Sequence, residues 1–470
     1  MILFLTVLLS IVQAQALPST ITVAPNSPVT SISAAIARAA PGDTIEVQAG
    51  VYPEHVVIDK PLTLVGLGNP VIDGGGVGII VLITAPDVTL RGFTLRNSGR
   101  LLEHEDGGIE SQAERTVIEG NHLENVLFGI YLNNAASGIV RGNFVRGMDL
   151  PSAHRGDLVR FWYSHDSLLE DNTTENGRDA VIWFSSNVMI RNNVIRNGRY
   201  GLHFMFCDNN TLIGNRLEGN SVGIYLMNSK NLTLTGNTMA RSRGPSGYGL
   251  GLKDMDGVQA EGNRFLDNRV AIYLDNPPSA TGITDQFHLN LFAHNDIGIL
   301  FLPHVRNTQL WDNIFWENTE QVAIQGGGEL KGNLWQKDGR GNYWSDYTGF
   351  DANEDGIGDL AYKSTSLFEN LMDRYPGLRL FNLSPATDAI DLAARAFPIT
   401  QPRPKMSDAN PQMNPPVIPP GPGMTRSPRA PALAVALGLL ALAAAILTIA
   451  YPQPQIRRRL TMFRHKQATP

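Results

Sequence analysis

A repeat of 21 or 22 residues constrains this chain more than any other feature of its sequence. Arg191-Asn192-Asn193, Ile213-Gly214-Asn215 and Thr235-Gly236-Asn237 each follow a short β-like run and lead into the next unit. Between them, the segments 201–205 (Gly-Leu-His-Phe-Met) and 223–227 (Gly-Ile-Tyr-Leu-Met) align at a spacing of 22. Self-similarity at such a period indicates a solenoid, and one unit is too short for a pair of helices. The sequence therefore predicts an all-β fold, a right-handed, single-stranded parallel β-helix.

Composition excludes several other classes of protein. A solenoid grows lengthwise, so a chain of 470 residues does not have to divide into several cores. The formal net charge of -6 is mild and argues against nucleic acid as the main partner. Cys207 is the only cysteine, which rules out an intrachain disulfide.

Both ends of the chain carry membrane signals. Residues 1–16 combine an apolar run with an Ala-Gln-Ala cleavage site and predict a signal peptide; because no basic residue stands at the start, an uncleaved anchor is the alternative. Residues 432–451 contain no charge and are long enough for a transmembrane helix, with a buried core helix as the alternative. The basic tail, 452–470, would stay in the cytoplasm. We therefore expect an exported, extracytoplasmic solenoid that the C-terminal helix anchors to the inner membrane.

Three segments are predicted between these ends. The β-helix with its N-terminal cap occupies residues 17–335, and a short helix over Ser31–Ala40 would cover the open end of the first coil. A C-terminal cap segment occupies residues 336–392. Residues 393–431 form a linker that is rich in proline and poor in apolar side chains, so we expect an unfolded tether there.

Asparagine recurs at one corner of the predicted coil. Because asparagine hydrogen-bonds its neighbours, a stacked ladder would satisfy polar groups at the turns, and we expect a structural role. The residues are Asn121, Asn143, Asn172, Asn193, Asn215, Asn237, Asn263, Asn313 and Asn333.

One repeated strand predicts an outward face. Its starts lie at Gly108, Gly129, Asp157, Ala180, Gly201, Gly223, Gly249, Ala271 and Gly298. Alternation places the first and third residues after each start inside and the second and fourth outside. The outward pairs are Tyr131/Asn133, Val159/Phe161, Ile182/Phe184, His203/Met205, Tyr225/Met227, Gly251/Lys253, Tyr273/Asp275 and Leu300/Leu302. An apolar stripe of this kind usually marks a binding surface, and the predicted partner surface is Phe161, Phe184, Tyr225, Lys253 and Tyr273. The alternative is that residues 335–392 fold back and cover it.

Soft metal ligands cluster within this stripe. His203, Met205 and Cys207 alternate and should project from one face, with Met227 beside Met205 and Met255 one coil further on. Imidazole, thioether and thiolate ligands select copper(I) over hard ions, so these five residues are the candidate copper ligands. Simple packing of methionine and aromatic side chains is the alternative.

A second candidate metal site follows the repeats. Oxygen ligands at positions 1, 3, 5 and 9 and glycine at position 6 are typical of the start of a calcium loop. The candidate ligands are Asp351, Asn353, Asp355, Ile357 through its carbonyl group, and Asp359. Position 12 is Tyr362 rather than glutamate, so a plain turn without calcium is the alternative.

Three segments give the chain a family resemblance. Residues 198–205 (GRYGLHFM), 247–253 (GYGLGLK) and 341–347 (GNYWSDY), the last leading into the Asp351 loop, resemble the NosD family over about residues 30–380. The resemblance implies a periplasmic β-helix that serves the maturation of nitrous oxide reductase. It also implies an ABC ATPase and permease (NosF and NosY) and a copper chaperone (NosL) as partners, which together supply copper to the copper-sulfide centre of the reductase. His203, Met205 and Lys253 lie within the family's signature segments. The C-terminal anchor and the non-basic signal lie outside the pattern.

The favoured function is a non-enzymatic accessory protein that docks the reductase or the chaperone and passes copper. The chain has no GxxxxGK[ST] loop, so energy would come from a partner. A carbohydrate lyase, hydrolase or epimerase is the main alternative, with Asp275 beside Lys253, or Asp166, Asp179 and Asp254 gathered at a corner, as its acids. A scaffolding or adhesive solenoid is a third.

Overall fold

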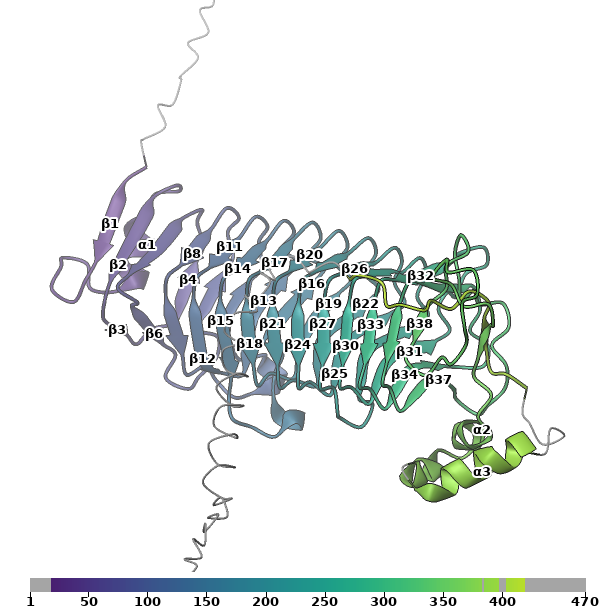
Figure 1. Ribbon diagram of the computed structural model, residues 1–470. Coiled ribbons are helices and arrows are strands. Elements are labelled where there is room, and N and C mark those ends of the chain that lie inside the picture. The colour runs from purple at the N-terminus through teal and green to yellow at the C-terminus, as the bar shows by residue number, and fades with distance from the viewer. Residues whose placement is uncertain (1–17, 383, 397–402, 419–470) are drawn as a thin grey trace, which may run out of the picture. The chain divides into compact units, whose positions relative to one another are not determined.

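The chain forms a parallel β-helix in which the coils contribute strands to three long sheets. The computed structural model describes residues 18–382, 384–396 and 403–418, and Figure 1 shows the coils stacked along the solenoid. Residues of successive coils pair in parallel, for example Ile224 with Leu250 and Met205 with Met227. The prediction of a parallel β-helix is confirmed.

The bounds of the strands follow the three sheets. Sheet A consists of β1 (Thr20–Val23), β2 (Thr44–Gln48), β5 (Thr63–Leu67), β8 (Thr89–Arg91), β11 (Val117–Glu119), β14 (Ile139–Arg141), β17 (Leu168–Glu170), β20 (Met189–Arg191), β23 (Thr211–Ile213), β26 (Thr233–Thr235), β29 (Gln259–Glu261), β32 (Asp285–His288) and β35 (Thr308–Trp311). Sheet B consists of β3 (Val51–Tyr52), β6 (Val71–Asp73), β9 (Thr94–Arg96), β12 (His122–Val126), β15 (Phe144–Gly147), β18 (Thr173–Glu175), β21 (Val194–Arg196), β24 (Arg216–Glu218), β27 (Thr238–Ala240), β30 (Arg264–Leu266), β33 (Leu291–Ala293), β36 (Ile314–Trp316) and β38 (Tyr343–Trp344). Sheet C consists of β4 (Val56–Ile58), β7 (Val81–Ile83), β10 (Gly107–Ser111), β13 (Phe128–Asn133), β16 (Val159–Trp162), β19 (Asp179–Trp183), β22 (Tyr200–Met205), β25 (Val222–Met227), β28 (Tyr248–Lys253), β31 (Val270–Asp275), β34 (Ile297–Phe301) and β37 (Glu320–Ile324).

The N-terminal end is capped as predicted. Helix α1 (Ile32–Arg38) begins at Ser31, whose hydroxyl accepts a hydrogen bond from the backbone N–H of Ala34. Ile32 and Ala35 are buried against the first coil. Two single-turn 3-10 helices, η1 (Leu102–His104) and η2 (Ser152–His154), lie in insertions of later coils.

A buried asparagine ladder runs along the solenoid. The side-chain oxygen of Asn215 accepts from both the backbone and the side-chain nitrogen of Asn193, and the pattern repeats from coil to coil. Its members are Asn121, Asn143, Asn172, Asn193, Asn215, Asn237, Asn263, Asn290, Asn313 and Asn342. The structural role is therefore confirmed, although Asn333 bonds elsewhere, to Thr308 and Val305, and two members were not predicted.

The predicted inward and outward positions are correct in most coils and wrong in two. Ile224 and Leu226, for example, are fully buried as predicted. In β16 and β19, however, the register pairs Phe161 with Ile182, and both side chains fill the core instead of facing outward. The positions equivalent to the predicted repeat starts are Leu158 and Asp179, each one residue from the predicted start. The insertion before β16 and the register shift after Asp179 change the spacing between coils, so the repeat could not be aligned correctly there. Phe161 is therefore a core residue and not part of a partner surface.

The C-terminal end carries a helical appendage. Helix α2 (Leu367–Arg374), η3 (Pro376–Phe381) and α3 (Pro385–Ala396) follow the last coil. Asp391 of α3 accepts hydrogen bonds from the Ser366 hydroxyl and from the Phe368 N–H, at the start of α2. The appendage contacts the solenoid through Asp373 of α2, which accepts from the backbone N–H of Ile324 at 3.0 Å.

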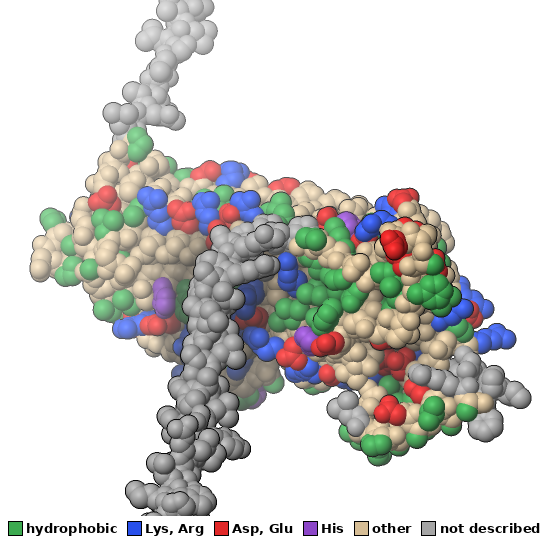
Figure 2. Space-filling view, viewed as in Figure 1, with side chains coloured by type: hydrophobic (Ala, Val, Ile, Leu, Met, Phe, Trp, Pro, Cys, Tyr) green, Lys and Arg blue, Asp and Glu red, His purple; other side chains and the backbone are tan. Residues whose placement is uncertain are grey.

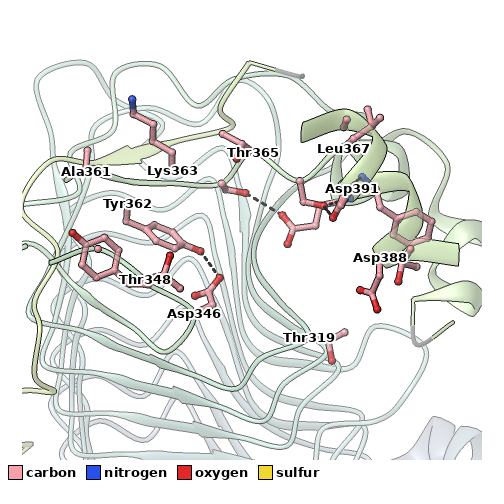
Figure 3. Close-up of a pocket in the computed structure, with 18 of the residues that line it drawn as sticks. Thr319, Asp346, Thr348, Ala361, Tyr362, Lys363, Thr365, Leu367, Asp388 and Asp391 are labelled. Carbon is pink, nitrogen blue, oxygen red and sulfur yellow. Dashed lines mark hydrogen bonds between the residues drawn. The ribbon is translucent and has the colours of Figure 1, made fainter. Parts of the chain in front are cut away.

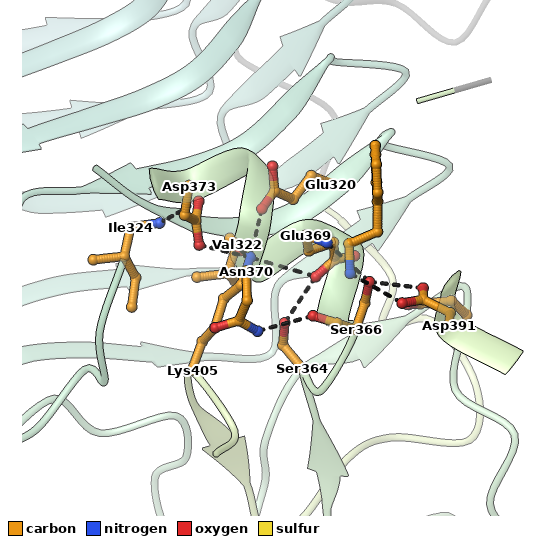
Figure 4. Close-up of polar contacts among 12 residues, drawn as sticks. Glu320, Val322, Ile324, Ser364, Ser366, Glu369, Asn370, Asp373, Asp391 and Lys405 are labelled. Atoms are coloured by element: carbon orange, nitrogen blue, oxygen red, sulfur yellow. Dashed lines mark hydrogen bonds and ion pairs between the residues drawn. The ribbon is translucent and has the colours of Figure 1, made fainter. Parts of the chain in front are cut away.

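Residues 403–418, which we call the strap, correct the expectation of an unfolded tether. β40 (Ser407–Asp408) pairs antiparallel with β39 (Tyr362–Lys363). The Lys405 side chain is fully buried, with Glu320 Oε1 at 2.5 Å and Asp373 Oδ2 at 2.9 Å (Figure 4). The strap, although poor in apolar residues, is thus folded through buried polar contacts. Amino-acid composition alone does not predict such contacts.

The predicted signal peptide (1–16), transmembrane helix (432–451) and basic tail (452–470) lie outside the described residues. In the part of the chain that is described, no helix has the length and apolar character needed to cross a membrane.

Candidate functional site

The outer face of sheet C carries two adjacent columns of side chains, one residue from each coil. The first column is Tyr131, Arg160, Val181, His203, Tyr225, Gly251, Tyr273 and Leu300. The second is Asn133, Trp162, Trp183, Met205, Met227, Lys253 and Asp275. Neighbouring strands lie about 4.8 Å apart, so the aromatic and thioether groups adjoin. On the face of the molecule that Figure 2 shows, basic and acidic side chains alternate along the upper edge of the solenoid, and hydrophobic side chains gather toward its C-terminal half.

His203 lies at the middle of this face among aromatic rings. The ring centroids of Tyr200, Trp183 and Tyr225 lie 4.8, 5.3 and 6.4 Å from that of His203. Its Nδ1 atom is buried without a hydrogen-bond partner and faces Oδ2 of Asp179 at 3.8 Å. The ring is therefore held between the aromatic side chains and a carboxylate.

Asp179 is a buried carboxylate that stays ionised. Its Oδ1 accepts from Arg199 Nε at 3.0 Å and from the Tyr200 N–H at 3.1 Å, and its Oδ2 accepts from Arg199 Nη2. Burial raises the pKa of Asp179, but His203 and Arg199 outweigh it and hold the pKa below its ordinary value. The carboxylate beside His203 is thus an acceptor only.

Met205 and Met227 are partly exposed and directly paired. They are Cα partners in the register of β22 and β25, and Met205 stands two residues after His203 on the same strand face. Trp183 precedes them in the column and Lys253 follows. His203, Met205 and Met227 therefore lie together on the outer face, as predicted.

Cys207 and Met255 lie elsewhere, and their placement on this face is wrong. Phe206 has a left-handed backbone with φ of 56°, which breaks the strand alternation and turns Cys207 into the core. The Cys207 thiol donates to the Ile182 carbonyl at 3.0 Å, and burial raises its pKa to about 11. Met255 follows Asp254, which has φ of 50°, and is buried in the same way.

An aromatic corner borders the methionines. Tyr163, Phe184 and Phe206 occupy the same corner in successive coils and stack with centroid separations of 4.9 and 5.3 Å. Tyr163 and Phe206 are 45% and 49% exposed. The rings form a ridge of apolar surface. Of the predicted partner surface, Phe184 lies in this ridge, and Tyr225, Lys253 and Tyr273 lie in the outward columns.

The helical appendage covers only the C-terminal end of this face. A cavity of about 630 Å³ lies between η3 and the last strands, with Tyr248, Leu300 and Leu380 among its lining residues. Met205 and Met227 stay partly exposed to solvent with respect to the described residues. The alternative that residues 335–392 cover the whole stripe is wrong for this part of the face.

The predicted calcium loop satisfies its own backbone. Asp351 accepts from the N–H groups of Asp355 and Gly356, and Asp359 accepts from the N–H of Ala352. Within residues 18–382, 384–396 and 403–418, no group of three or more His, Cys, Asp and Glu side chains is arranged to hold a metal ion. Calcium at this loop, with Asn353 and Ile357 as further ligands, stays a prediction.

A second cavity, of about 580 Å³, lies between the segments that flank the calcium-like loop, residues 346–349 and 360–365, and the helical appendage (Figure 3). Two of the acidic side chains that line it have hydrogen-bond partners within the protein, since Asp346 accepts from the Tyr362 hydroxyl and Asp391 from the Ser366 hydroxyl. The first bond closes the segment around the calcium-like loop, and the second ties the start of α2 to α3.

The carboxylates considered for sugar chemistry do not gather. Asp166 and Asp254 lie in the turns after β16 and β28, four coils apart, and accept from the side chains of Asn187 and Asn276. Asp179 lies on β19 and is paired with Arg199. Asp275 faces outward beside Lys253, its Cα partner.

Sequence reasoning missed Asp179, Arg199, Trp183 and the aromatic corner. One signal was present, because Asn-Gly-Arg stands at 176–178 and again at 197–199. In both cases the arginine binds a buried aspartate near the start of the sheet C strand of the preceding coil, Asp157 for Arg178 and Asp179 for Arg199.

Fold and face together define a parallel β-helix protein with a soft-ligand and aromatic surface on one sheet. The family model described as "Periplasmic copper-binding protein (NosD)" matches residues 144–349. A "Probable ABC transporter binding protein NosD" of Pseudomonas aeruginosa is 32% identical over 447 residues, which cover 83% of this chain and 94% of that protein. A protein of the same description from Stutzerimonas stutzeri is 30% identical over 395 residues, or 78% and 85% of the two chains. This chain belongs to the NosD family.

Solved structures share the fold at low identity. The catalytic domain of an α-1,3-glucanase in complex with tetrasaccharides is similar with a TM-score of 0.53 and 12% identity, covering 70% of each chain. A likeness at this level shows the architecture alone.

Proposed function

We propose that this chain is an extracytoplasmic accessory protein for the maturation of nitrous oxide reductase. It binds copper(I) transiently at His203, Met205 and Met227 and passes it on toward the copper-sulfide centre. Membership of a family described as periplasmic and copper-binding supports both the location and the metal.

The observation that carries the proposal is the register of β22 and β25. It sets Met205 beside Met227 and leaves His203 two residues away on the same face. An imidazole and two thioethers form a neutral, soft donor set, which favours copper(I) over magnesium, calcium or manganese. The open side of the set faces outward, so that an ion can be received and released.

The aromatic corner is the docking surface in this proposal. Tyr163, Phe184 and Phe206 form an exposed apolar ridge next to the methionines, and such ridges mark protein interfaces. The occupant is the reductase or the copper chaperone NosL, which would bring its own metal site over His203. The names of the relatives support an ABC transporter as a further partner, with NosF and NosY as ATPase and permease. The apolar segment 432–451 would anchor the chain beside that permease.

Anaerobic titration with a chromophoric copper(I) chelator tests the metal site in the full chain. His203→Ala, Met205→Leu and Met227→Leu should each weaken copper(I) binding about tenfold or more, since a lost ligand costs about 1.4 kcal/mol or more. Met189→Leu on sheet A is the matched control, because Met189 is also partly exposed. Unweakened stoichiometric binding by all three site variants would reject these ligands.

Co-purification with the reductase tests the docking surface. Phe206→Ala and Phe184→Ala should reduce capture of the reductase or of NosL, whereas Trp316→Ala should not. Trp316 is 38% exposed but lies on sheet B. Equal capture by all variants would place the interface elsewhere.

A further inference from the structure

The fold orients the imidazole ring of His203, so that one of its two nitrogens, Nδ1, faces a carboxylate. Nδ1 is buried and faces Asp179 at 3.8 Å, while 11% of the His203 side chain is exposed. Since Nδ1 is buried, that exposure belongs to other atoms of the side chain, and Nε2 lies across the ring from Nδ1. The rings of Trp183 and Tyr200 pack close to the imidazole and limit its rotation.

The carboxylate that Nδ1 faces is fixed more firmly than the histidine. Arg199 binds both oxygens of Asp179, and the Tyr200 N–H adds a further bond to Oδ1. The Asp179 side chain is 1% exposed. Its Oδ2 therefore offers an acceptor in a set place, and a small ring movement brings Nδ1–H within hydrogen-bond distance.

We propose that Asp179 is a positioning residue that holds His203 in the Nδ1–H tautomer and thereby keeps the Nε2 lone pair free for copper(I). Histidines that bind metals commonly donate their other ring N–H to a carboxylate, which orients the ring and raises its basicity. Arg199 and Tyr200 in turn hold the carboxylate. This inference rests on the proposed copper site and assigns a task to residues outside it.

The variant Asp179→Asn reverses the direction of this contact. The amide oxygen takes the Oδ1 position, where it accepts from two donors, Arg199 Nε and the Tyr200 N–H; the Oδ2 position faces only one, Arg199 Nη2, which then loses its acceptor. The amide nitrogen then occupies the Oδ2 position and donates to Nδ1 of His203. Since Nδ1 has become an acceptor, the proton moves to Nε2, and the free lone pair is lost from the outward side of the ring.

Long-range ¹H–¹⁵N spectra of the full chain, labelled with ¹⁵N-histidine, read the tautomer directly. His203 is assigned by the loss of its signals in His203→Gln. The wild type should show the Nδ1–H tautomer and Asp179→Asn the Nε2–H tautomer, and the copper(I) affinity of Asp179→Asn should fall about tenfold. A merely structural role of Asp179 would not exchange the ring proton between nitrogens.

The matched control is Asp157→Asn, one coil earlier. Asp157 is also buried and bound by an arginine, Arg178, at 3.2 Å, but among the described residues no histidine is paired with it. It should leave the His203 tautomer and the copper(I) affinity unchanged. An Nε2–H tautomer in the wild type overturns the inference even if Asp179→Asn fails to fold.

The outcomes separate this inference from the proposed function. A wild-type chain that binds no copper(I) rejects the metal site, whatever the tautomer. A wild-type chain that binds copper(I), combined with an Asp179→Asn variant that keeps both tautomer and affinity, rejects only the role of Asp179.

Discussion

The asparagine ladder and the C-terminal clamp hold buried polar groups in opposite ways. In the ladder, which runs from Asn121 to Asn342, each amide is neutral and the same hydrogen bonds repeat from coil to coil, as Asn193 and Asn215 show. In the clamp, charged side chains from three segments that are far apart in the sequence form one cluster of ion pairs. The clamp comprises Lys405, Glu320, Asp373, Glu369 and Arg379. The ladder can be repeated in each added coil. The clamp forms once, at the C-terminal end of the solenoid.

The contrast explains why the strap folds with so few apolar residues. Although burial lowers the pKa of Lys405, the carboxylates around it raise that pKa above its ordinary value, so the side chain stays charged. An unpaired charge in this position would lower the stability of the fold, because Lys405, Glu320 and Asp373 are almost fully shielded from solvent. The strap is therefore held by ion pairs between buried groups of opposite charge, and the ladder by hydrogen bonds that repeat in successive coils.

Breaking the clamp should have the largest effect on stability. Lys405→Ala removes the buried cation between Glu320 and Asp373 and leaves only the partly exposed Arg379 to balance them, which costs about 3–5 kcal/mol. Hydrogen exchange should show that α2 and the strap lose protection while the middle coils keep theirs. Lys363→Ala is the control, because Lys363 is exposed on the strand that pairs with the strap. Unchanged protection of the strap in Lys405→Ala would show that the clamp does not hold it.

Removing one member of the ladder should cost less. Asn215→Ala deprives the backbone and side chain of Asn193 of an acceptor and the Ile190 carbonyl of a donor. Groups that lose their partners in a buried place cost about 1–3 kcal/mol, which urea denaturation would measure.

An exposed asparagine supplies the control for the ladder. Asn231 donates to Asn209 at the surface and has φ of 57°, so Asn231→Gly keeps the backbone conformation and removes only this bond. It should destabilise by clearly less than Asn215→Ala. Equal losses would mean that burial of the ladder contributes nothing.

The regular part of the molecule was predictable because one environment recurs. The spacing of 22 residues was enough to place His203, Met205 and Met227 on one face and Leu202 and Phe204 in the core. Alternation failed at the corners, where left-handed residues such as Phe206 reverse the side on which the next residue lies. Cys207 and Met255 were misplaced for that reason.

The irregular parts were not predictable from local pattern. Lys405 looks like any charged residue of a Pro-rich linker, and its partners Glu320 and Asp373 lie 85 and 32 positions earlier in the sequence. Asp179 likewise gains its meaning from Arg199 and His203 in the next coil. Contacts that occur once, between distant segments, leave no periodic signal.

The two regions should also differ in their response to pH. Burial, reinforced by repulsion from Glu320 and opposed by Lys405, raises the pKa of Asp373 to about 6. The folded clamp thus binds this proton more tightly than the unfolded chain, so its contribution to stability is present at low pH and is lost as the pH rises through about 6. Strap amides should show a higher free energy of opening at pH 5 than at pH 7.5. Asp373→Asn should reduce this difference. Ladder amides near Asn215 should show none, and a matching pH dependence there would contradict the contrast.

The smallest effect is expected at Cys207, which lies in the repeating part of the molecule although its type suggests chemistry. Its thiol donates to the Ile182 carbonyl inside the core, and burial raises its pKa to about 11, so it offers neither a thiolate nor access. Cys207→Ser places a hydroxyl of similar shape at the same corner, where Ser185 and Ser229 already stand in the neighbouring coils. The copper(I) affinity should therefore stay unchanged in Cys207→Ser, and a thiol reagent should label the wild-type chain only after denaturation. Rapid labelling of the native chain, or weaker copper(I) binding by Cys207→Ser, would return Cys207 to the metal site and show that the corner opens in solution.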